Sequence, residues 1–365
     1  RARREYPWGL WACGRCALGN LSCGYRVCSG TMRMTHKKPI LILGSNSFSA
    51  TSFIEYLLSA GYKVIGVSRS EEVTQVFRRY ETNSNLANFS FMQLDLREGS
   101  EAIAEIVNAK QIEYIFNFAA QSMVAQSWDY PEHWYQTNIA ALAELGNLLI
   151  KENSIKKFVH FTTPEVYGST SGWLKEGFNF APSTPYAVSR AAGDWHLKCL
   201  FDNYGFPVIF TRAANVYGPG QQLYRIIPRT ILSALTRQKL PLHGGGKSIR
   251  SFIHMDDVSS ALEAIMNHGE NGDSYHISTD AITSIFDLVK TLANLLKIDV
   301  EELVERGPER PGKDFAYQLS SEKIRTELDW TDKIDLNAGL ADTLKWAELH
   351  LDELRKLPID YEHKR

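Results

Sequence analysis

The sequence predicts an α/β protein with a doubly wound parallel sheet and a smaller C-terminal α/β lobe. Three observations support this prediction. Short apolar segments alternate with amphipathic ones over residues 38–212, the first apolar segment ends at Gly44, and after Gly218 the alternation gives way to loops rich in glycine and polar residues. Strands that alternate with helices form parallel sheets through right-handed crossovers.

The elements follow in order from the apolar periodicity. The apolar run before Gly44 is a buried first strand, and Phe53, Leu57 and Leu58 share one face of the helix that follows it. By the same patterns, strands are expected at 38–43, 63–67, 89–94, 114–118, 157–161, 207–212, 252–254 and 274–278, and helices at 49–60, 101–109, 134–152, 185–204, 226–237, 256–267 and 284–296.

The composition is that of a globular protein, with 365 residues, 44% hydrophobic and 22% charged, and a net charge of −2. This balance, and the lack of any apolar run near the roughly 20 residues of a membrane span, predicts neither a nucleic-acid nor a membrane partner. Cys199 is the single cysteine after residue 39. It predicts a reduced, cytoplasmic setting, with the thiol in the core.

Residues 1–39 differ from the rest of the chain. They carry eight Lys or Arg against one acid, and four of the five cysteines, Cys13, Cys16, Cys23 and Cys28. A zinc knuckle and a transit peptide are both compatible with this segment. The interpretation we favour is a leader or disordered extension with no metal, followed by a working protein that starts near Met32 or Met34.

The first strand-to-helix turn, GSNSFSA at 44–50, is compatible with a dinucleotide-binding loop. Such a loop uses three small residues, so that the backbone turns tightly and approaches the pyrophosphate. Gly44 keeps the first place, Ser47 replaces the second glycine, and Ala50 takes the third, which needs only close packing. The expected cofactor contacts of this loop are Gly44, Asn46, Ser47 and Phe48.

The end of the second strand bears on the choice of cofactor. Ser68 and Arg69 stand where NAD enzymes usually carry an acid for the ribose 2′-hydroxyl. A guanidinium pairs well with a 2′-phosphate, so the sequence predicts NADP in preference to NAD. Asp95, followed by Leu96 after the third strand, either faces the adenine or caps a turn.

This reading divides the chain into four parts. It predicts the extension at 1–37, a Rossmann-type dinucleotide-binding domain at 38–218, and a mainly substrate-binding lobe at 219–350 with one or more segments that return to the first domain. A C-terminal tail at 351–365 completes the chain.

Two short segments carry the candidate catalytic groups. TTPEVYG at 162–168 follows a strand and supplies Thr163 and Glu165, and PYAVSR at 185–190 opens a helix and supplies Tyr186 and Arg190. A hydroxyl, a carboxylate, a phenol and a fixed cation are the groups needed to take a hydride and a proton from a sugar carbon. Because a nearby cation lowers the pKa of a phenol, Tyr186 is the candidate base.

These segments belong to a longer ordered set of motifs: FAAQS at 118–122, TNIAAL at 137–142, RAANVYGPGQ at 212–221, IIPRTI at 226–231, LHGGGKSIRSFIHMDD at 242–257, YHIST at 275–279 and ERPGKD at 309–314. The set resembles the extended short-chain dehydrogenase/reductase superfamily. Within it, the chain looks most like the NAD(P)-dependent nucleotide-sugar 4,6-dehydratases of the dTDP-glucose and GDP-mannose type. The resemblance covers residues 38–350. It implies a nucleotide-sugar substrate and a homodimer formed through the helices at 134–152 and 185–204.

The resemblance also implies roles for individual residues. Tyr186 and Thr163 act on the sugar C4 hydroxyl, and Glu165 removes the C5 proton before water leaves C6 and hydride returns there. Implied cofactor contacts are Ala119, Ala120, Gln121, Tyr186 and Arg190. Implied substrate contacts are Gln121, Ser122, Asn215, Arg225, His243, Arg250 and Arg310.

Three residues depart from the pattern of the resembled enzymes: Ser47, Pro164 and Arg190. Pro164 stands where the dTDP-glucose enzymes carry Asp, so the acid for loss of water is left to Glu165, Tyr167 or a water molecule. Arg190 replaces a lysine, keeping its charge without its ability to exchange a proton. The sequence predicts a 4,6-dehydratase that yields an NDP-4-keto-6-deoxy sugar. A 4-epimerase or UDP-glucuronate decarboxylase is the alternative, and a non-catalytic nucleotide-binding protein a remote one.

Overall fold

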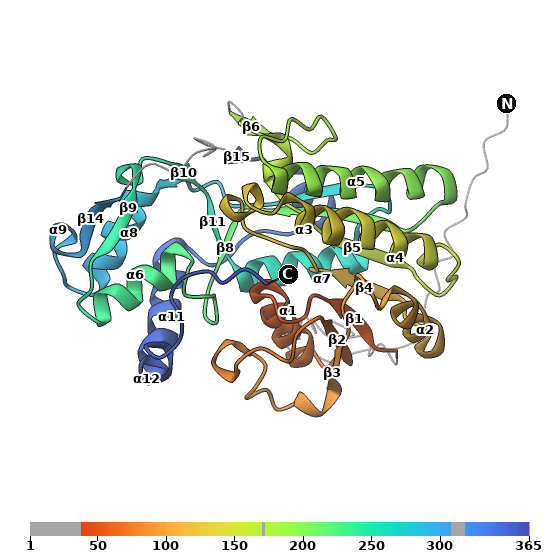
Figure 1. The fold of residues 1–365 in the computed structure, drawn as a ribbon, viewed down its shortest axis with the longest axis horizontal. Coiled ribbons are helices and arrows are strands. Elements are labelled where there is room, and N and C mark those ends of the chain that lie inside the picture. Colours follow the sequence, from red (N-terminus) through yellow and green to blue (C-terminus); the bar gives the residue numbers. More distant parts are fainter. Residues whose placement is uncertain (1–37, 170–171, 308–317, 365) are drawn as a thin grey trace, which may run out of the picture. The chain divides into compact units, whose positions relative to one another are not determined.

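The computed structural model describes residues 38–169, 172–307 and 318–364, and residues 35–365 form one compact unit. Its centre is a parallel seven-stranded sheet in the order β12-β7-β5-β4-β1-β2-β3 (Figure 1). The strands are β1 (Ile40–Leu43), β2 (Val64–Ser68), β3 (Phe89–Gln93), β4 (Tyr114–Asn117), β5 (Lys157–Phe161), β7 (Val208–Ala213) and β12 (Ser274–Ile277). The strand order reverses between β1 and β4, where doubly wound sheets bind ligands at the carboxyl ends of their strands. The predicted fold class is confirmed.

Alternating side chains of β1 show how the sheet is buried on both faces. Ile40 and Ile42 belong to the core under α1 and α7, whereas Leu41 and Leu43 belong to the core under α2, α4 and α5. Successive side chains of a strand point to opposite faces, so an uninterrupted apolar strand needs a cover on each side. The covering helices are α1 (Phe48–Ser59), α7 (Met255–His268), α2 (Ser100–Lys110), α4 (Leu142–Leu149) and α5 (Pro185–Tyr204).

The single helix expected at 134–152 is wrong in detail. The structure has α3 (Pro131–Tyr135), a π-helical turn (Gln136–Ala141) and then α4. Asn138 in the π turn is buried, and its amide donates to the Gln121 carbonyl (3.0 Å) and to Ser189 Oγ (2.9 Å) and accepts from the Gln121 N–H (2.8 Å). These three bonds hold the wider turn against the chain that follows β4. Such π turns are common at functional sites.

The smaller lobe begins after Gly218, where the regular alternation of apolar and amphipathic segments ends. It is built around α6 (Ile226–Leu235), α8 (Ile285–Leu295) and α11 (Leu336–Leu349), beside the parallel pair β9 (Leu240–His243) and β14 (Val304–Gly307). The strand expected at 274–278 is present as β12, which leaves this lobe and pairs with β7 of the main sheet. Elements without a sequence prediction are β6 (Trp173–Leu174), β8 (Asn215–Tyr217), β10 (Ile249–Arg250), β13 (Thr283–Ser284), β15 (Gln318–Leu319), α9 (Val300–Leu303), α10 (Glu322–Leu328) and α12 (Leu351–Leu354).

Several other expectations meet the structure here. Cys199 is exposed, so its expected core position is wrong: it points outward from α5, whose apolar face is formed by residues such as Leu197 and Leu200. Within the described ranges, no helix is both long and apolar enough to cross a bilayer. The same ranges hold no cluster of metal-ligating side chains. The extension at 1–37, with its four cysteines, and Arg310 lie outside the described residues.

Candidate functional site

The first catalytic segment forms a tight turn at the carboxyl end of β5. Thr163 caps a 3₁₀ helix (Pro164–Tyr167), and its hydroxyl accepts a hydrogen bond from the Glu165 N–H at 3.3 Å. Proline suits the first position of such a helix, because its fixed φ fits and its missing N–H would have no partner there. Pro164 therefore fits the turn. It separates Thr163 from Glu165 by one buried residue whose side chain has no polar group.

The second segment brings Tyr186 to the first turn of α5. Thr184 caps this helix, and the Tyr186 N–H donates to Ser127 Oγ at 3.1 Å. Burial raises the pKa of Tyr186, and the Glu165 charge adds to this effect. The Arg190 charge and a hydrogen bond from Thr163 act in the opposite direction. Thr163, Glu165 and Arg190 thus all act on the Tyr186 phenol, but its net pKa shift is upward, because the effect of burial exceeds the lowering expected from the nearby cation.

Arg190, one helical turn after Tyr186 on α5, is buried. Its Nη2 donates to the Phe161 carbonyl at 2.6 Å, and it lies 3.4 Å from His160 Nε2. Nε of Arg190 is buried without a hydrogen-bond partner among the described residues. The guanidinium is therefore held by the end of β5, and its charge acts to lower the pKa of Tyr186.

A hydrogen-bond chain fixes the protonation of His160. The Asn117 Oδ1 accepts from the Ala119 N–H (3.0 Å), so its Nδ2 is the group that donates to His160 Nδ1 (3.1 Å). The proton of the neutral imidazole is then on Nε2, which faces Asp194 Oδ1 at 3.4 Å. Burial lowers the pKa of His160, although Asp194 opposes this. The ring is consequently a neutral donor, and it offers Arg190 no acceptor.

Asp194 supplies the negative charge behind the site. It is fully buried on α5, accepts from Thr162 Oγ1 (3.1 Å) and pairs with Arg212 Nη2 (2.7 Å). Burial acts to raise the pKa of Asp194, but Arg212 and His160 hold it below the usual carboxyl value. Asp194 therefore stays ionised and compensates two buried guanidinium groups, of which Arg190 is the second.

Tyr167 contacts groups other than the four candidate catalytic side chains. Its hydroxyl lies 2.8 Å from His276 Nε2 and 3.3 Å from the Gly177 carbonyl, and its ring lies 5.3 Å from the Arg212 guanidinium. Burial raises the pKa of Tyr167. These contacts hold the Tyr167 hydroxyl against His276 and the Gly177 carbonyl.

The turn after β1 has the shape that a dinucleotide requires. Gly44 has φ +75°, and a Cβ at this position would lie 2.5 Å from the Ala119 nitrogen. Ser47 caps α1, and its Oγ accepts from the Ala50 N–H at 3.3 Å. The residue that departs from the glycine pattern therefore turns its hydroxyl toward the helix N-terminus, and the backbone cradle at Gly44 is kept.

Other predicted cofactor residues have structural partners. The Asn46 side chain bonds the Glu71 carbonyl (2.8 Å) and the Val73 N–H (3.1 Å), which secures the loop after β2. Asp95 pairs with Arg97 Nη2 at 2.7 Å, as expected of a residue that caps a turn. Phe48 and Leu96 are buried in the two main cores. Ser68 is the last residue of β2, and Ala120 and Ser122 lie partly buried after β4.

Gln121 and Arg69 both contact the end of the chain. Gln121 Nε2 lies 3.2 Å from the Lys364 carbonyl, and Arg69 Nη2 donates to the same oxygen at 3.1 Å. Burial lowers the pKa of Arg69. The two predicted cofactor residues therefore come together, and the residue that joins them was not predicted.

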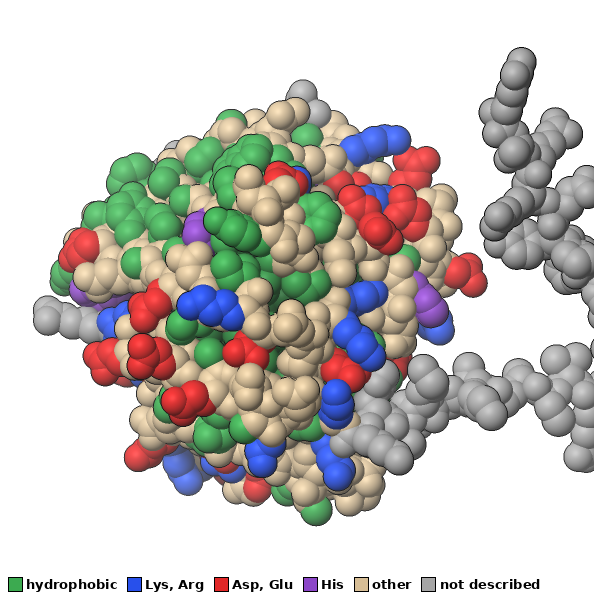
Figure 2. Space-filling view, turned by 90° about the vertical axis from the view of Figure 1, so that its right-hand side faces the viewer, with side chains coloured by type: hydrophobic (Ala, Val, Ile, Leu, Met, Phe, Trp, Pro, Cys, Tyr) green, Lys and Arg blue, Asp and Glu red, His purple; other side chains and the backbone are tan. Residues whose placement is uncertain are grey.

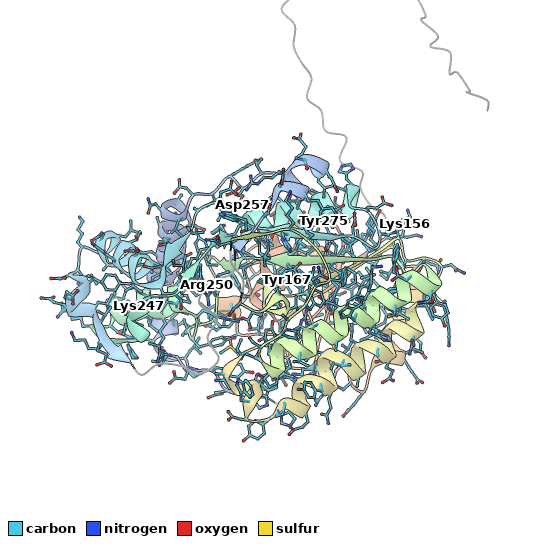
Figure 3. The ribbon with its side chains drawn as sticks, turned by 90° about the horizontal axis from the view of Figure 1, so that it is seen from above. Lys156, Tyr167, Lys247, Arg250, Asp257 and Tyr275 are labelled. Carbon is cyan, nitrogen blue, oxygen red and sulfur yellow. The ribbon has the colours of Figure 1, made fainter. Side chains whose placement is uncertain are left out.

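The predicted substrate residues fall into two groups. Gln121 and Ser122 follow β4 of the main sheet, whereas Asn215, Arg225, His243 and Arg250 come after β7. Asn215 on β8 donates to the Ser251 carbonyl (3.2 Å), and Arg250 on β10 donates to the Ile249 carbonyl (2.8 Å). Figure 3 shows Arg250 beyond Tyr167, toward the smaller lobe. His243 ends β9. Arg225 precedes α6 with its guanidinium 5.4 Å from the Tyr224 ring, and its charge acts to lower the pKa of Tyr186.

The sequence analysis did not predict the buried charged residues Asp194 and Arg212. Asp194 lies four residues after Arg190, on the same face of α5, and Arg212 follows Thr211 near the end of β7. A carboxylate one helical turn from the predicted catalytic cation was the available signal, because residues at i and i+4 are neighbours on a helix. No pattern in the sequence predicted the contacts of residues 360–364.

The chain is similar to known proteins over most of its length. The family model described as GDP-mannose 4,6-dehydratase matches residues 41–343. The dTDP-D-glucose 4,6-dehydratase of Homo sapiens is 30% identical over 317 residues, which cover 85% of this chain and 89% of that protein. A trifunctional UDP-glucose 4,6-dehydratase/UDP-4-keto-6-deoxy-D-glucose 3,5-epimerase/UDP-4-keto-L-rhamnose-reductase of Arabidopsis thaliana is 30% identical over 319 residues, which cover 85% of this chain. The chain spans about half the length of that relative (47%).

The fold has a solved counterpart with bound ligands. The crystal structure of a dTDP-glucose 4,6-dehydratase from Streptomyces venezuelae, with NAD and TYD bound, superposes with a TM-score of 0.78 at 27% identity. The match covers 86% of this chain and 98% of that one.

Proposed function

The chain belongs to the GDP-mannose 4,6-dehydratase family, and from that membership we propose that it is a nucleotide-sugar 4,6-dehydratase. The product is an NDP-4-keto-6-deoxy sugar. The observation that carries the proposal is the grouping of Thr163, Glu165 and Arg190 around the Tyr186 phenol, at the carboxyl edge of the sheet. An epimerase needs the phenol and the hydroxyl, whereas elimination also needs a base for the C5 proton, which Glu165 provides.

The cofactor in this proposal is a nicotinamide dinucleotide. The residues fit such a group, because the Gly44 cradle has no room for a side chain and Ser47 faces the N-terminus of α1. Gly44, Ser47 and Arg69 would hold it, and when bound it supplies the hydride acceptor at C4 and the donor at C6. We propose NADP in preference to NAD, because Ser68 and Arg69 place hydroxyl and guanidinium groups at the end of β2.

Side chains of this chain handle the protons. Tyr186 takes the proton of the C4 hydroxyl, and the Arg190 charge stabilises the phenolate that must form first. Thr163 has one hydroxyl that accepts from the Glu165 N–H and donates to Tyr186, so the turn orients the phenol. Glu165 takes the C5 proton, and returning that proton to the C6 oxygen balances the loss of water. This single-residue route follows from Pro164, which offers no acid.

The test is mass spectrometry of products after incubation with UDP-, dTDP-, GDP- and CDP-sugars. Loss of one water from one of these sugars supports the proposal. Loss of carbon dioxide from UDP-glucuronate identifies the decarboxylase alternative, which Pro164 favours because that reaction needs no acid at C6. An unchanged mass with a C4 epimer identifies the epimerase. Unchanged substrates in the presence of bound cofactor identify a non-catalytic nucleotide-binding protein.

We also propose that the chain forms a homodimer through α5 and its neighbours. Val188 and Trp195 are exposed on α5 seven residues apart, which places them on one face of the helix, and Tyr135 is exposed at the end of α3. Figure 2 shows hydrophobic side chains gathered on the upper part of one face, at the level of α4 and α5. Trp134, which precedes Tyr135 on α3, is fully buried and belongs to the core.

A further inference from the structure

The last described residues, 360–364, form an extended segment that we call the C-terminal strap. It starts on the smaller lobe, where Asp360 pairs with Arg229 of α6 at 2.8 Å. Tyr361 then packs edge-on against Tyr224, with ring centroids 5.3 Å apart. Side-chain exposure alternates along the strap, with Tyr361 and His363 partly buried and the intervening Glu362 exposed. One side of the strap therefore faces the protein.

His363 anchors the strap on α3. Its Nε2 lies 2.8 Å from His133 Nδ1, and its ring is stacked parallel to Trp134, with centroids 5.1 Å apart and planes inclined by 4°. Tyr130 stacks on it as well, at 5.5 Å. An imidazole held by a hydrogen bond and aromatic neighbours is a specific contact, since each requires a defined ring orientation.

The strap ends on the predicted cofactor residues. The Lys364 carbonyl accepts from Arg69, which follows β2, and from Gln121, which follows β4, at 3.1 and 3.2 Å. Gln121 Nε2 also lies 3.1 Å from His363 Nδ1. Strand β1 lies between β2 and β4 in the sheet, so a single oxygen bonded to both loops lies over the carboxyl end of β1. The Gly44 turn begins there.

We propose that the C-terminal strap is an autoinhibitory segment, which closes the dinucleotide site and must leave before the cofactor binds. The inference rests on the proposed function, because it takes the Gly44 turn, Arg69 and Gln121 as the cofactor site. The strap uses the donors of Arg69 and Gln121 that would otherwise serve the cofactor. A site that is open for only a fraction of the time shows an apparent affinity reduced by that fraction. The strap thus sets the cofactor concentration at which the enzyme becomes active.

The test compares cofactor binding by the full chain and two variants, each freed of bound nucleotide. Tyr361→Ala/His363→Ala removes the inward-facing side chains of the strap, and Glu362→Ala is the matched control on its exposed side. Titrations with NAD and NADP should show roughly tenfold tighter binding by the double variant and an unchanged dissociation constant for the control. Equal or weaker binding by the double variant overturns the strap proposal and leaves the proposed function standing.

A second measurement follows the strap itself. Diethyl pyrocarbonate modifies accessible imidazoles, and mass spectrometry gives the rate at His363 relative to the exposed His268. Saturating cofactor should accelerate modification of His363 in the unmodified chain. Slower or unchanged modification while cofactor is bound shows that strap and cofactor coexist, and overturns the proposal. If neither nucleotide binds any of the three proteins, the proposed function fails, and the strap proposal fails with it.

Discussion

At the scale of single residues, the hydroxyl of Thr163 makes two hydrogen bonds in the turn after β5. Its hydroxyl closes the 3₁₀ helix by accepting from the Glu165 N–H and donates toward Tyr186. A hydroxyl has one proton and two lone pairs, so both bonds are compatible. Pro164 fits the first position of this turn and adds no polar side chain, so it supplies no acid.

The proposed division of labour between Tyr186 and Glu165 is testable with Tyr186→Phe and Glu165→Gln. Loss of the phenol removes the base for C4 oxidation, and we expect turnover to fall by about 100- to 10,000-fold with no reduced nicotinamide detectable in the near ultraviolet. Glu165→Gln should still reduce the cofactor in a single turnover. It should not exchange the C5 proton with deuterium from solvent, as read by mass spectrometry. Exchange at the wild-type rate in Glu165→Gln would contradict the assignment.

Gly44 gives a second prediction at this scale. Gly44→Ala places a Cβ 2.5 Å from the Ala119 nitrogen at a positive φ, so the loop must shift and both stability and cofactor affinity should fall. The matched control is Gly61→Ala, which has φ +85° but no atom within 4 Å of the added Cβ. The control should lose about 1 kcal/mol of unfolding free energy from the left-handed conformation alone. Chemical denaturation of the two variants compares them, and equal losses would show that the contact with Ala119 is unimportant.

The choice of dinucleotide depends on Arg69. We expect NADP to bind at least about tenfold more tightly than NAD, since a charge-assisted hydrogen bond contributes about 1.5–3 kcal/mol. Arg69→Ser should remove this difference between the two nucleotides. Isothermal titration of both nucleotides measures it, and a preference for NAD in the unmodified chain would overturn the NADP proposal.

At the scale of elements, α5 and β7 hold the charged residues behind the site. The guanidinium of Arg212 is bonded to Asp194 and lies 5.0–5.6 Å from the rings of Tyr167, Phe178 and Phe180. Burying a guanidinium is costly unless a partner compensates its charge. The pair therefore locks the carboxyl end of β7 to the middle of α5, the helix that carries Tyr186 and Arg190.

Removal of one member of this pair should be costly. Arg212→Met keeps the side-chain length but leaves Asp194 ionised without its closest partner, and we expect the unfolding free energy to fall by about 3–5 kcal/mol. Lys175→Ala, which breaks an exposed pair with Glu322, is the control and should change stability little. Urea denaturation compares the two. A loss in Arg212→Met no larger than in the control would refute a compensating role for the pair.

At the scale of the whole molecule, buried histidines link stability to pH. Burial lowers the pKa of His276 to about 3, well below its value near 6.5 in an unfolded chain. Between these two pKa values the unfolded state binds a proton that the folded state does not. The free energy of unfolding therefore falls as pH falls from about 6.5 toward 3. His276 alone should remove about 2 kcal/mol of stability between pH 7 and pH 5.

The comparison is with His276→Gln, whose amide can still bond the Tyr167 hydroxyl but does not titrate. Unfolding free energies at pH 7 and pH 5 should differ less in the variant than in the unmodified chain. His160, whose pKa burial also lowers, contributes in the same direction in both proteins. An identical pH dependence in the two proteins would contradict the assignment to His276.

The proposed dimer is also a property of the whole molecule. Trp195→Glu places a charge on the exposed face of α5, and the mass measured by light scattering should fall from that of two chains toward the 41.3 kDa of one. Trp173→Glu is the control, because Trp173 is equally exposed (45% against 47%) but lies on β6. A single-chain mass for the unmodified protein would overturn the dimer.

The sequence by itself determined the features that local patterns encode. Apolar periodicity predicted the strands and helices of the sheet, because spacing along a strand or helix places side chains on known faces. The family was predicted from the resemblance of an ordered set of motifs, which includes the segments around Thr163 and Tyr186. The roles of the individual site residues remain predictions. The glycine of the first turn was also recognisable, since its backbone conformation is a local requirement.

Only the tertiary structure decided the contacts between segments distant in the chain. It broke the expected helix at Asn138, paired Asp194 with Arg212, and brought Lys364 to Gln121 across 243 positions. Hydrogen bonds and buried charges are satisfied by whichever partner the packed fold brings within reach, and no local pattern encodes that partner. The core and the candidate catalytic segments were therefore predictable, whereas the buried Asp194–Arg212 pair and the contacts of Lys364 with Arg69 and Gln121 were not.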